Sequence, residues 1–228
     1  NNPTGTVLRT EEMEMLVGIA RERNLFLLSD EVYREFVYDG VSPDTFLRLA
    51  VGDMKDKIVV MDSLSKRYSL CGIRLGTLVS YNTELLDTVL KFAQARLSSG
   101  YIDQVVASAL TEVPDSFFRE TGTEYQSRRD ILMHGLSKIP GVVCPPAPEG
   151  AFYMMVKLPV EDSEDFAKFL LTDFADNNET LMVAPAAGFY QTEGQGLSEV
   201  RIAYVLNTEK LKRCVELLGK ALLLYKKS

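Results

Sequence analysis

The first half of the chain alternates short apolar runs with amphipathic segments. Apolar runs typical of buried strands occupy residues 25–29, 58–61 and 75–80. Between and after them, apolar residues recur at spacings of three and four, which predicts helices near residues 10–20, 85–97 and 105–110. Strands separated by helices predict an α/β layer with a largely parallel sheet, and such sheets bind ligands at the carboxyl ends of their strands. Asp30 and Ser63 both follow strands at such ends, and Thr10 is expected to cap the first helix.

The pattern changes after Pro114. A long polar helix is predicted from about residue 115 to residue 137, and two amphipathic helices follow around residues 166–174 and 211–222. Short strands are predicted near residues 142–144, 151–156, 181–183 and 199–205. Strands gathered around fewer helices indicate a separate α+β layer. We therefore expect two domains, residues 1–113 and residues 114–228.

Composition and charge narrow the function classes. The chain has 228 residues, 46% apolar and 25% charged, which is typical of a globular protein. A net charge of −7 argues against a nucleic-acid partner, because phosphate backbones attract basic surfaces. Cys71, Cys144 and Cys214 are odd in number and lack metal-ligand spacing, so we expect reduced thiols in a cytoplasmic protein. No apolar run is long enough for a membrane span, and a single histidine, His134, excludes a His-Asp relay and a histidine-rich metal site.

The stretch most suggestive of chemistry is S-L-S-K at residues 63–66. It places Lys66 just after an apolar strand, flanked by hydroxyl groups and followed eight residues later by Arg74. A lysine amine can bond covalently to an aldehyde, while Ser63, Ser65 and Arg74 can hold a phosphate. Pyridoxal phosphate chemistry requires this combination, since the cofactor needs a covalent anchor for its aldehyde and a separate cradle for its phosphate.

Four further motifs follow one another along the chain. They are N-P-T-G at residues 2–5, S-D-E-V-Y at residues 29–33, G-x-R-x-G at residues 72–76 and R-I-A at residues 201–203. Together with S-L-S-K, these motifs resemble those of the fold-type I pyridoxal phosphate enzymes, specifically the class I/II aminotransferases related to aspartate aminotransferase. The order and spacing of all five agree with that family from the first residue to the last helix, whereas N-P-T-G or G-x-R-x-G alone is a weak signal.

The resemblance implies a fold and an activity. The first motif begins at residue 2, and the family's chains extend well upstream of it, so we expect the C-terminal portion of a longer enzyme. The expected fold is α/β, with the C-terminal part of the cofactor-binding large domain at residues 1–113 and the α+β small domain at residues 114–228. The expected activity is the transfer of an amino group between an amino acid and a 2-oxo acid, by a homodimer. Because the family's first phosphate-binding turn and stacking ring lie upstream, we expect the chain alone to bind the cofactor weakly and not to transaminate.

The resemblance also assigns roles in the chemistry. Lys66 is expected to anchor the cofactor covalently and to act as the base at the substrate Cα. Asp30 is expected to keep the pyridine nitrogen protonated, which makes the ring an electron sink. Tyr33 and Asn2 are expected to hydrogen-bond the ring hydroxyl group.

Phosphate and substrate binding fall to other residues. Arg74 with Ser63 is expected to bind the phosphate, and Ser65 to contribute to it. Arg201 is expected to grip the substrate α-carboxylate through two parallel hydrogen bonds, which a lysine cannot reproduce. For the substrate side chain the sequence offers only Arg96, by its neighbourhood in the chain. Residues 184–190 read A-P-A-A-G-F-Y where family members often have a Pro-Gly pair, so this substrate-facing loop is expected to differ.

Each site residue has a structural alternative. Lys66 can be a surface lysine, and Tyr33 can simply pack under a sheet edge. Asp30 after an apolar strand also resembles a Walker B carboxylate, but the chain has no G-x-x-x-x-G-K-[ST] loop to accompany it. Arg201 can pair with Glu199 on the same strand face. For function, the alternatives are a pyridoxal phosphate-dependent lyase, decarboxylase or synthase of the same fold, and the cofactor-sensing domain of a transcription regulator.

Overall fold

The computed structural model describes residues 1–225 and divides the chain into two compact units. The first spans Val7–Glu120 and is called the lysine unit here, because it contains Lys66. The second is called the arginine unit, because it contains Arg201; it joins Asn1–Thr6 to the chain from residue 121 onwards.

This division differs from the boundary predicted after residue 113. One long helix, α5 (Asp115–Leu136), continues across the boundary that the structure shows. Pro114 directly precedes the start of this helix. The first six residues also belong with the arginine unit, which the order of elements along the chain could not reveal.

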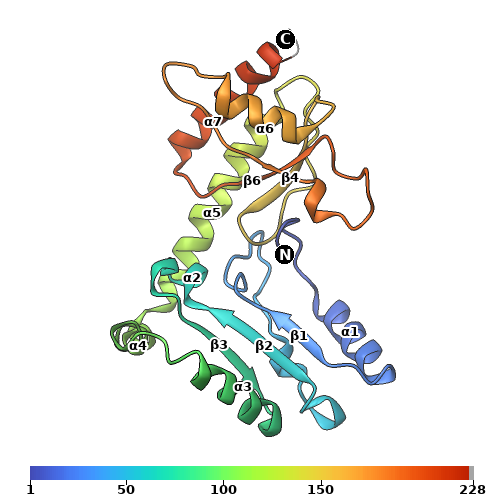
Figure 1. Ribbon diagram of the computed structural model, residues 1–228, viewed down its shortest axis with the longest axis vertical. Coiled ribbons are helices and arrows are strands. Elements are labelled where there is room, and N and C mark those ends of the chain that lie inside the picture. The colour runs from blue at the N-terminus through green and yellow to red at the C-terminus, as the bar shows by residue number, and fades with distance from the viewer. Residues whose placement is uncertain (226–228) are drawn as a thin grey trace. The chain divides into compact units, whose positions relative to one another are not determined.

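The lysine unit is built on a sheet with strand order β1-β2-β3 (Figure 1). In chain order its main elements are α1 (Thr10–Glu22), β1 (Leu27–Asp30), β2 (Ile58–Ser63), α2 (Leu64–Arg67), β3 (Gly76–Ser80), α3 (Thr83–Ala95) and α4 (Tyr101–Ser108). Short 3-10 helices lie between them at Phe46–Leu49, Gly52–Met54 and Cys71–Ile73, and after them at Ala109–Glu112.

The pairing in this sheet is mixed. β1 runs parallel to β2, with Asp30 opposite Met61. β3 runs antiparallel to β2, with Gly76 opposite Ser63. The predicted α/β class is confirmed, but the largely parallel pairing is found only between β1 and β2. The connection from β2 to β3 contains only short helical turns and lacks the longer helix that usually carries the chain back along the sheet in a parallel pair.

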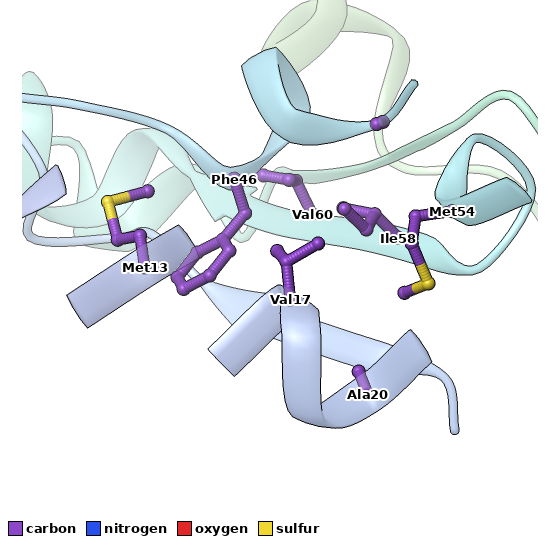
Figure 2. Close-up of a cluster of buried hydrophobic side chains, with 8 residues drawn as sticks. Met13, Val17, Ala20, Phe46, Met54, Ile58 and Val60 are labelled. Atoms are coloured by element: carbon purple, nitrogen blue, oxygen red, sulfur yellow. The ribbon is translucent and has the colours of Figure 1, made fainter. Parts of the chain in front are cut away.

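The core of the lysine unit gathers between α1 and β2 (Figure 2). Met13, Val17 and Ala20 recur at helical spacing on one face of α1 and are buried. Ile58 and Val60 belong to the same buried cluster and share one face of β2, because alternate residues of a strand point to the same side. Full burial of such side chains contributes roughly 1.5–3 kcal/mol each. The apolar spacing thus holds α1 against the strand that leads to Lys66.

The start of α1 differs from the prediction. The helix begins at Thr10 itself, so Arg9 and not Thr10 occupies the N-cap position. The Arg9 backbone N–H donates to the Glu12 carboxylate at 2.7 Å, and this carboxylate lies in the first turn, where the helix dipole favours negative charge. The Thr10 hydroxyl instead donates to Asp44 at 3.4 Å.

The arginine unit contains an antiparallel sheet of strand order β4-β6-β5. With α5, its elements are β4 (Tyr153–Lys157), α6 (Ser163–Thr172), β5 (Ala184–Pro185), β6 (Glu199–Ala203) and α7 (Thr208–Tyr225). The strand predicted at residues 142–144 is reduced to a single bridge between Val143 and Lys157. The strand predicted at residues 181–183 begins at Ala184 instead.

The side chains of this second sheet divide between its two faces. Met154, Val156 and Val200 are fully buried, as are Phe166 and Leu170 of α6. The other face carries the side chains that alternate with them, where the β4–β6 register sets Met155 opposite Arg201 and Tyr153 opposite Ala203.

Within the described part of the chain, no helix combines the length and the apolar character needed to cross a bilayer.

Candidate active site

Asp30 lies at the carboxyl end of β1, beside the end of β2. Its side chain is exposed, and one carboxylate oxygen accepts the Val32 N–H at 3.2 Å. Tyr33 follows in the next turn, half-buried, with its ring edge-on to Phe36 at 6.4 Å between ring centres. The parallel pairing therefore brings Asp30 to the same edge of the sheet as the residues that follow β2, as expected.

Glu31 anchors this edge, and the sequence alone did not identify it. Although only 7% exposed, its carboxylate accepts hydrogen bonds from the Ser29 hydroxyl at 3.1 Å, the Thr45 hydroxyl at 3.0 Å and the Phe46 N–H at 2.9 Å. A buried carboxylate is stable only when it is satisfied in this way. The sequence signal was the adjacent pair Asp30 and Glu31. Asp30 is exposed at the candidate site, whereas the buried Glu31 fixes the loop.

Ser63 and Ser65 together start the short helix that carries Lys66. Ser63 ends β2, and its hydroxyl oxygen accepts the Ser65 N–H at 3.1 Å. The two hydroxyl oxygens are 2.9 Å apart, and the Ser63 hydroxyl also lies 3.3 Å from the Leu75 carbonyl. Lys66 is half-buried in α2. The serines thus set the direction in which the lysine leaves the sheet, besides offering hydroxyl groups to a ligand.

Arg74 lies on the other side of this turn, just before β3. Its backbone has φ 55° and ψ 38°, a left-handed conformation, and its exposed guanidinium donates to the Cys71 carbonyl at 3.0 Å. Two residues on, Gly76 pairs with Ser63, and a Cβ at Gly76 would lie 2.9 Å from the Asp62 carbonyl. The second glycine of G-x-R-x-G therefore permits the close pairing of Ser63 with the strand that begins two residues after Arg74.

Arg67, next to Lys66, is a further residue that the motifs did not single out. Its guanidinium forms an ion pair with Asp62, the residue before Ser63, and lies 3.6 Å from Glu35. All three side chains are largely shielded from solvent. This network ties α2 to the end of β2 and to the loop after β1, and so restrains Lys66.

In the arginine unit, Arg201 is held from several directions. Its Nη1 donates to the Asn2 side-chain oxygen at 2.8 Å, across nearly the whole sequence. The Tyr153 ring lies 4.5 Å and the Phe189 ring 5.1 Å from the guanidinium carbon. Glu199, the alternative partner, accepts the Tyr190 hydroxyl at 2.5 Å, and this hydrogen bond raises the pKa of Tyr190.

Gly5 explains how N-P-T-G reaches Arg201. Its φ is +72°, and its carbonyl accepts the N–H groups of Glu149 at 3.0 Å and Gly150 at 2.8 Å. A Cβ at this position would lie 2.5 Å from the Cβ of Pro148, so only glycine fits. The turn is thereby fixed to the segment before β4, and Asn2 lies beside β6.

The donor groups of the lysine unit fit a phosphorylated pyridine aldehyde. Hydroxyl groups and a guanidinium, as in Ser63, Ser65 and Arg74, suit a phosphate. The Asp30 carboxylate suits a protonated ring nitrogen, and the Lys66 amine suits an aldehyde. Across residues 1–225, no three His, Cys, Asp or Glu side chains come together as a candidate metal site.

Comparison with known proteins places the chain in a family. The model of the family "Aminotransferase class I and II" matches residues 1–218. The chain is 30% identical to aromatic-amino-acid aminotransferase 2 of Thermococcus litoralis, over 97% of this chain and 55% of that protein. It is 31% identical to an aspartate aminotransferase of Thermotoga maritima, over 95% of this chain and 52% of that protein. The chain thus spans about half the length of these curated relatives.

Solved structures of aminotransferases share this fold. The crystal structure of aspartate aminotransferase from Thermotoga maritima superposes with a TM-score of 0.81 at 28% identity, over 98% of this chain and 54% of that one. α-Aminoadipate aminotransferase from Thermus thermophilus, complexed with N-(5'-phosphopyridoxyl)-L-leucine, superposes with a TM-score of 0.84 at 23% identity, over 97% and 56%, and shows the shared fold. From the family match and these relatives, we conclude that the chain belongs to the class I and II aminotransferases.

Proposed function

We propose that this chain carries the lysine-bearing part of a pyridoxal phosphate-dependent aminotransferase, which moves an amino group between an amino acid and a 2-oxo acid. The observation that carries the proposal is the edge of the lysine unit's sheet, where β1 ends at Asp30 opposite Met61, β2 continues two residues further to Ser63, and Lys66 follows. Ligands of open α/β sheets bind at such an edge. Family membership supports the same cofactor and reaction.

Lys66 is the proposed covalent anchor and base. When bound, pyridoxal phosphate supplies an aldehyde that condenses with amines and a ring that withdraws electrons from the substrate Cα. Uncharged Lys66 Nζ would take up the proton that leaves the amino acid Cα in one half of the reaction and would supply a proton to the carbonyl carbon of the 2-oxo acid in the other half.

The remaining residues of the lysine unit hold the cofactor. Asp30 pairs with the ring nitrogen and keeps its proton in place. Tyr33 donates a hydrogen bond to the ring oxygen. Arg74 and Ser63, with Ser65, bind the phosphate, which the pairing of Ser63 with Gly76, two residues after Arg74, supports.

The arginine unit supplies the substrate contact. Arg201 binds the α-carboxylate that amino acids and 2-oxo acids share, through two parallel N–H donors. Asn2 accepts from Arg201 Nη1 and so helps to orient it, besides its proposed hydrogen bond to the ring oxygen. We further propose that the working enzyme is a cytoplasmic homodimer, as the resemblance implies.

Reductive labelling tests the anchor. The protein from the complete gene, incubated with pyridoxal phosphate and reduced with borohydride, should carry the label on the peptide that contains Lys66. Lys66→Ala should still bind the cofactor, through Arg74 and Asp30, and should lose turnover, whereas Lys91→Ala, at an exposed position of α3, should be unaffected. Label on another lysine would show that the assignment is wrong.

Turnover assays test the reaction. Amino transfer from an amino acid to a 2-oxo acid distinguishes an aminotransferase from a lyase, decarboxylase or synthase, which releases or joins other groups. Asp30→Asn should leave the fold intact and cost about 3 kcal/mol of transition-state stabilisation, because an amide cannot hold the ring proton. Near-normal turnover of Asp30→Asn would remove this residue from the site.

A further inference from the structure

Two aromatic rings surround Arg201, and no motif assigned them a role. Tyr153, from β4, is 8% exposed and lies 4.5 Å from the guanidinium carbon. Phe189, from the 3-10 helix Ala187–Phe189, is 43% exposed and lies 5.1 Å from it. Rings at these distances attract a guanidinium electrostatically and restrict its orientation.

The guanidinium nitrogens of Arg201 are not equivalent. Nη1 donates to Asn2 at 2.8 Å. Nε is buried and has no hydrogen-bond partner among the described residues. A carboxylate can bind an arginine side-on, through Nε and one terminal nitrogen, or end-on, through both terminal nitrogens. Because Nε has no access to solvent here, only the end-on approach is open.

The segment that carries Phe189 is fastened to the same strand as Arg201. Ala184 pairs with Arg201 in the β5–β6 ladder, and the Ala186 N–H donates to the Glu199 carbonyl at 2.9 Å. Tyr190, the next residue, donates its hydroxyl to the Glu199 carboxylate at 2.5 Å. Phe189 is therefore held between two attachments to β6, although nearly half of its surface is exposed.

We propose that Tyr153 and Phe189 form an aromatic clamp that positions Arg201 to receive a carboxylate end-on, through its terminal nitrogens. The proposal rests on the proposed function, since it takes Arg201 as the carboxylate-binding residue. Both rings are positioning residues, and Asn2 completes the orientation by holding Nη1. The clamp gives the flexible arginine one orientation before the ligand arrives, so less freedom is lost on binding.

Nuclear magnetic resonance of the arginine Nε–H groups in the protein from the complete gene tests the clamp without added cofactor or turnover. The Arg201 signal is assigned by its loss in Arg201→Lys, and propionate is the carboxylate probe. In the wild type we expect a slowly exchanging Nε–H at Arg201. We also expect propionate to change the NMR signals of the protein, and this change should be absent in Arg201→Lys. In Phe189→Leu we expect faster Nε–H exchange and about tenfold weaker propionate binding, which is the size of one such contact.

Matched variants separate positioning from folding. Tyr153→Phe keeps a ring and should behave as the wild type, whereas Tyr153→Leu should resemble Phe189→Leu. Phe92→Leu, on the exposed surface of α3, should change neither readout. Three results would each overturn the clamp: wild-type exchange at Arg201 as fast as at the exposed Arg23, unchanged propionate affinity in Phe189→Leu, or no propionate binding at Arg201. None of these results depends on pyridoxal phosphate, so the clamp and the aminotransferase activity can fail independently.

Discussion

The amphipathic helices of the two units differ in how much of their apolar surface is buried. In the arginine unit, α6 and α7 bury their apolar faces, with Phe166 and Leu170 fully enclosed. In the lysine unit, α3 and α4 have apolar residues at the same kind of spacing, yet no residue of either helix is buried by the part of the chain that the structure describes. Phe92 of α3 remains 73% exposed and Ile102 of α4 76% exposed.

The open edge of the lysine unit's sheet shows the same difference. β1 pairs only with β2 among the described strands, and Leu28 on it is 63% exposed. A groove of about 410 Å³ runs along β1 and is lined by apolar side chains that include Leu25 and Phe26. Helical spacing of apolar residues therefore predicts a helix, but it does not predict whether another surface covers that helix. Exposed apolar area of this kind favours association, so the lysine unit should dominate the solution behaviour of the chain.

The largest effect should come from a pair of phenylalanines with opposite surroundings. Phe166→Ala removes a fully buried ring from α6 and should lower the free energy of unfolding of the arginine unit by about 3–5 kcal/mol. Phe92→Ala changes a ring that is 73% exposed and should stay within about 0.5 kcal/mol. Urea denaturation followed by circular dichroism measures both. Equal losses in the two variants would mean that the two units do not differ in this way.

The next largest effect should come from two glycines, whose substitution by alanine should change stability in opposite directions. Gly5→Ala forces a side chain onto a left-handed backbone and against Pro148, so the free energy that protects the Glu149 and Gly150 amides from exchange should fall by about 2–4 kcal/mol. Gly18→Ala, in α1 with open space around it, should stabilise the lysine unit by about 1 kcal/mol. Hydrogen exchange reports both. Undiminished amide protection in Gly5→Ala would contradict the role given to this turn.

A buried carboxylate tests how firmly the edge of the lysine unit is built. The Ser29, Thr45 and Phe46 donors all bind Oε1, and Arg34 lies 3.4 Å from Oε2. Glu31→Gln can keep an oxygen for the three donors but turns an NH2 group towards the Arg34 guanidinium, and should cost about 1–3 kcal/mol. Glu22→Gln, at an exposed position of α1, is the control and should be nearly neutral. Thermal unfolding of the two variants decides the matter, and matching melting temperatures would argue against a structural role for Glu31.

The smallest effect should be a pH dependence confined to the arginine unit. Hydrogen bonds from Lys220 and Arg213 lower the pKa of Asp176. The ionised form is therefore favoured by folding, so its contribution is fully present above the unfolded pKa of about 3.9 and is lost as the pH falls through the lower folded value. Asp176→Asn should flatten the loss of melting temperature in this acid range, while Asp87→Asn in the lysine unit should not. An unchanged acid profile in Asp176→Asn would show that the ion pairs are too solvated to matter.

Local pattern was a good guide to the elements and to where the candidate residues of the lysine unit lie along its sheet. The polar helix predicted from residue 115 to about 137 is found at Asp115–Leu136. The strands before Asp30 and Ser63 were also predicted, because a buried strand and the polar residue that ends it are close in sequence. The same reasoning brings Lys66 and Arg74 to this edge, since a short turn between paired strands keeps them near each other.

What the sequence missed depends on contacts between distant residues. The direction of β3 was not readable, since period-two alternation is the same in parallel and antiparallel strands. The rings around Arg201 depend on the register of β4 against β6 and on the loop after β5, neither of which has a local signal. Glu31 looked like half of a motif, and only its burial shows that it fixes the loop.

The connection of Asn1–Thr6 to the arginine unit has a consequence for folding kinetics. The whole lysine unit is inserted between this turn and the rest of its own unit. The hydrogen bonds of Gly5 to Glu149 and Gly150 are therefore among the least local contacts of the chain, and such contacts form slowly because a long loop must close first. During synthesis, a complete lysine unit leaves the ribosome before Arg201 exists. We expect the hydrogen bond between Asn2 and Arg201 to be one of the last contacts to form.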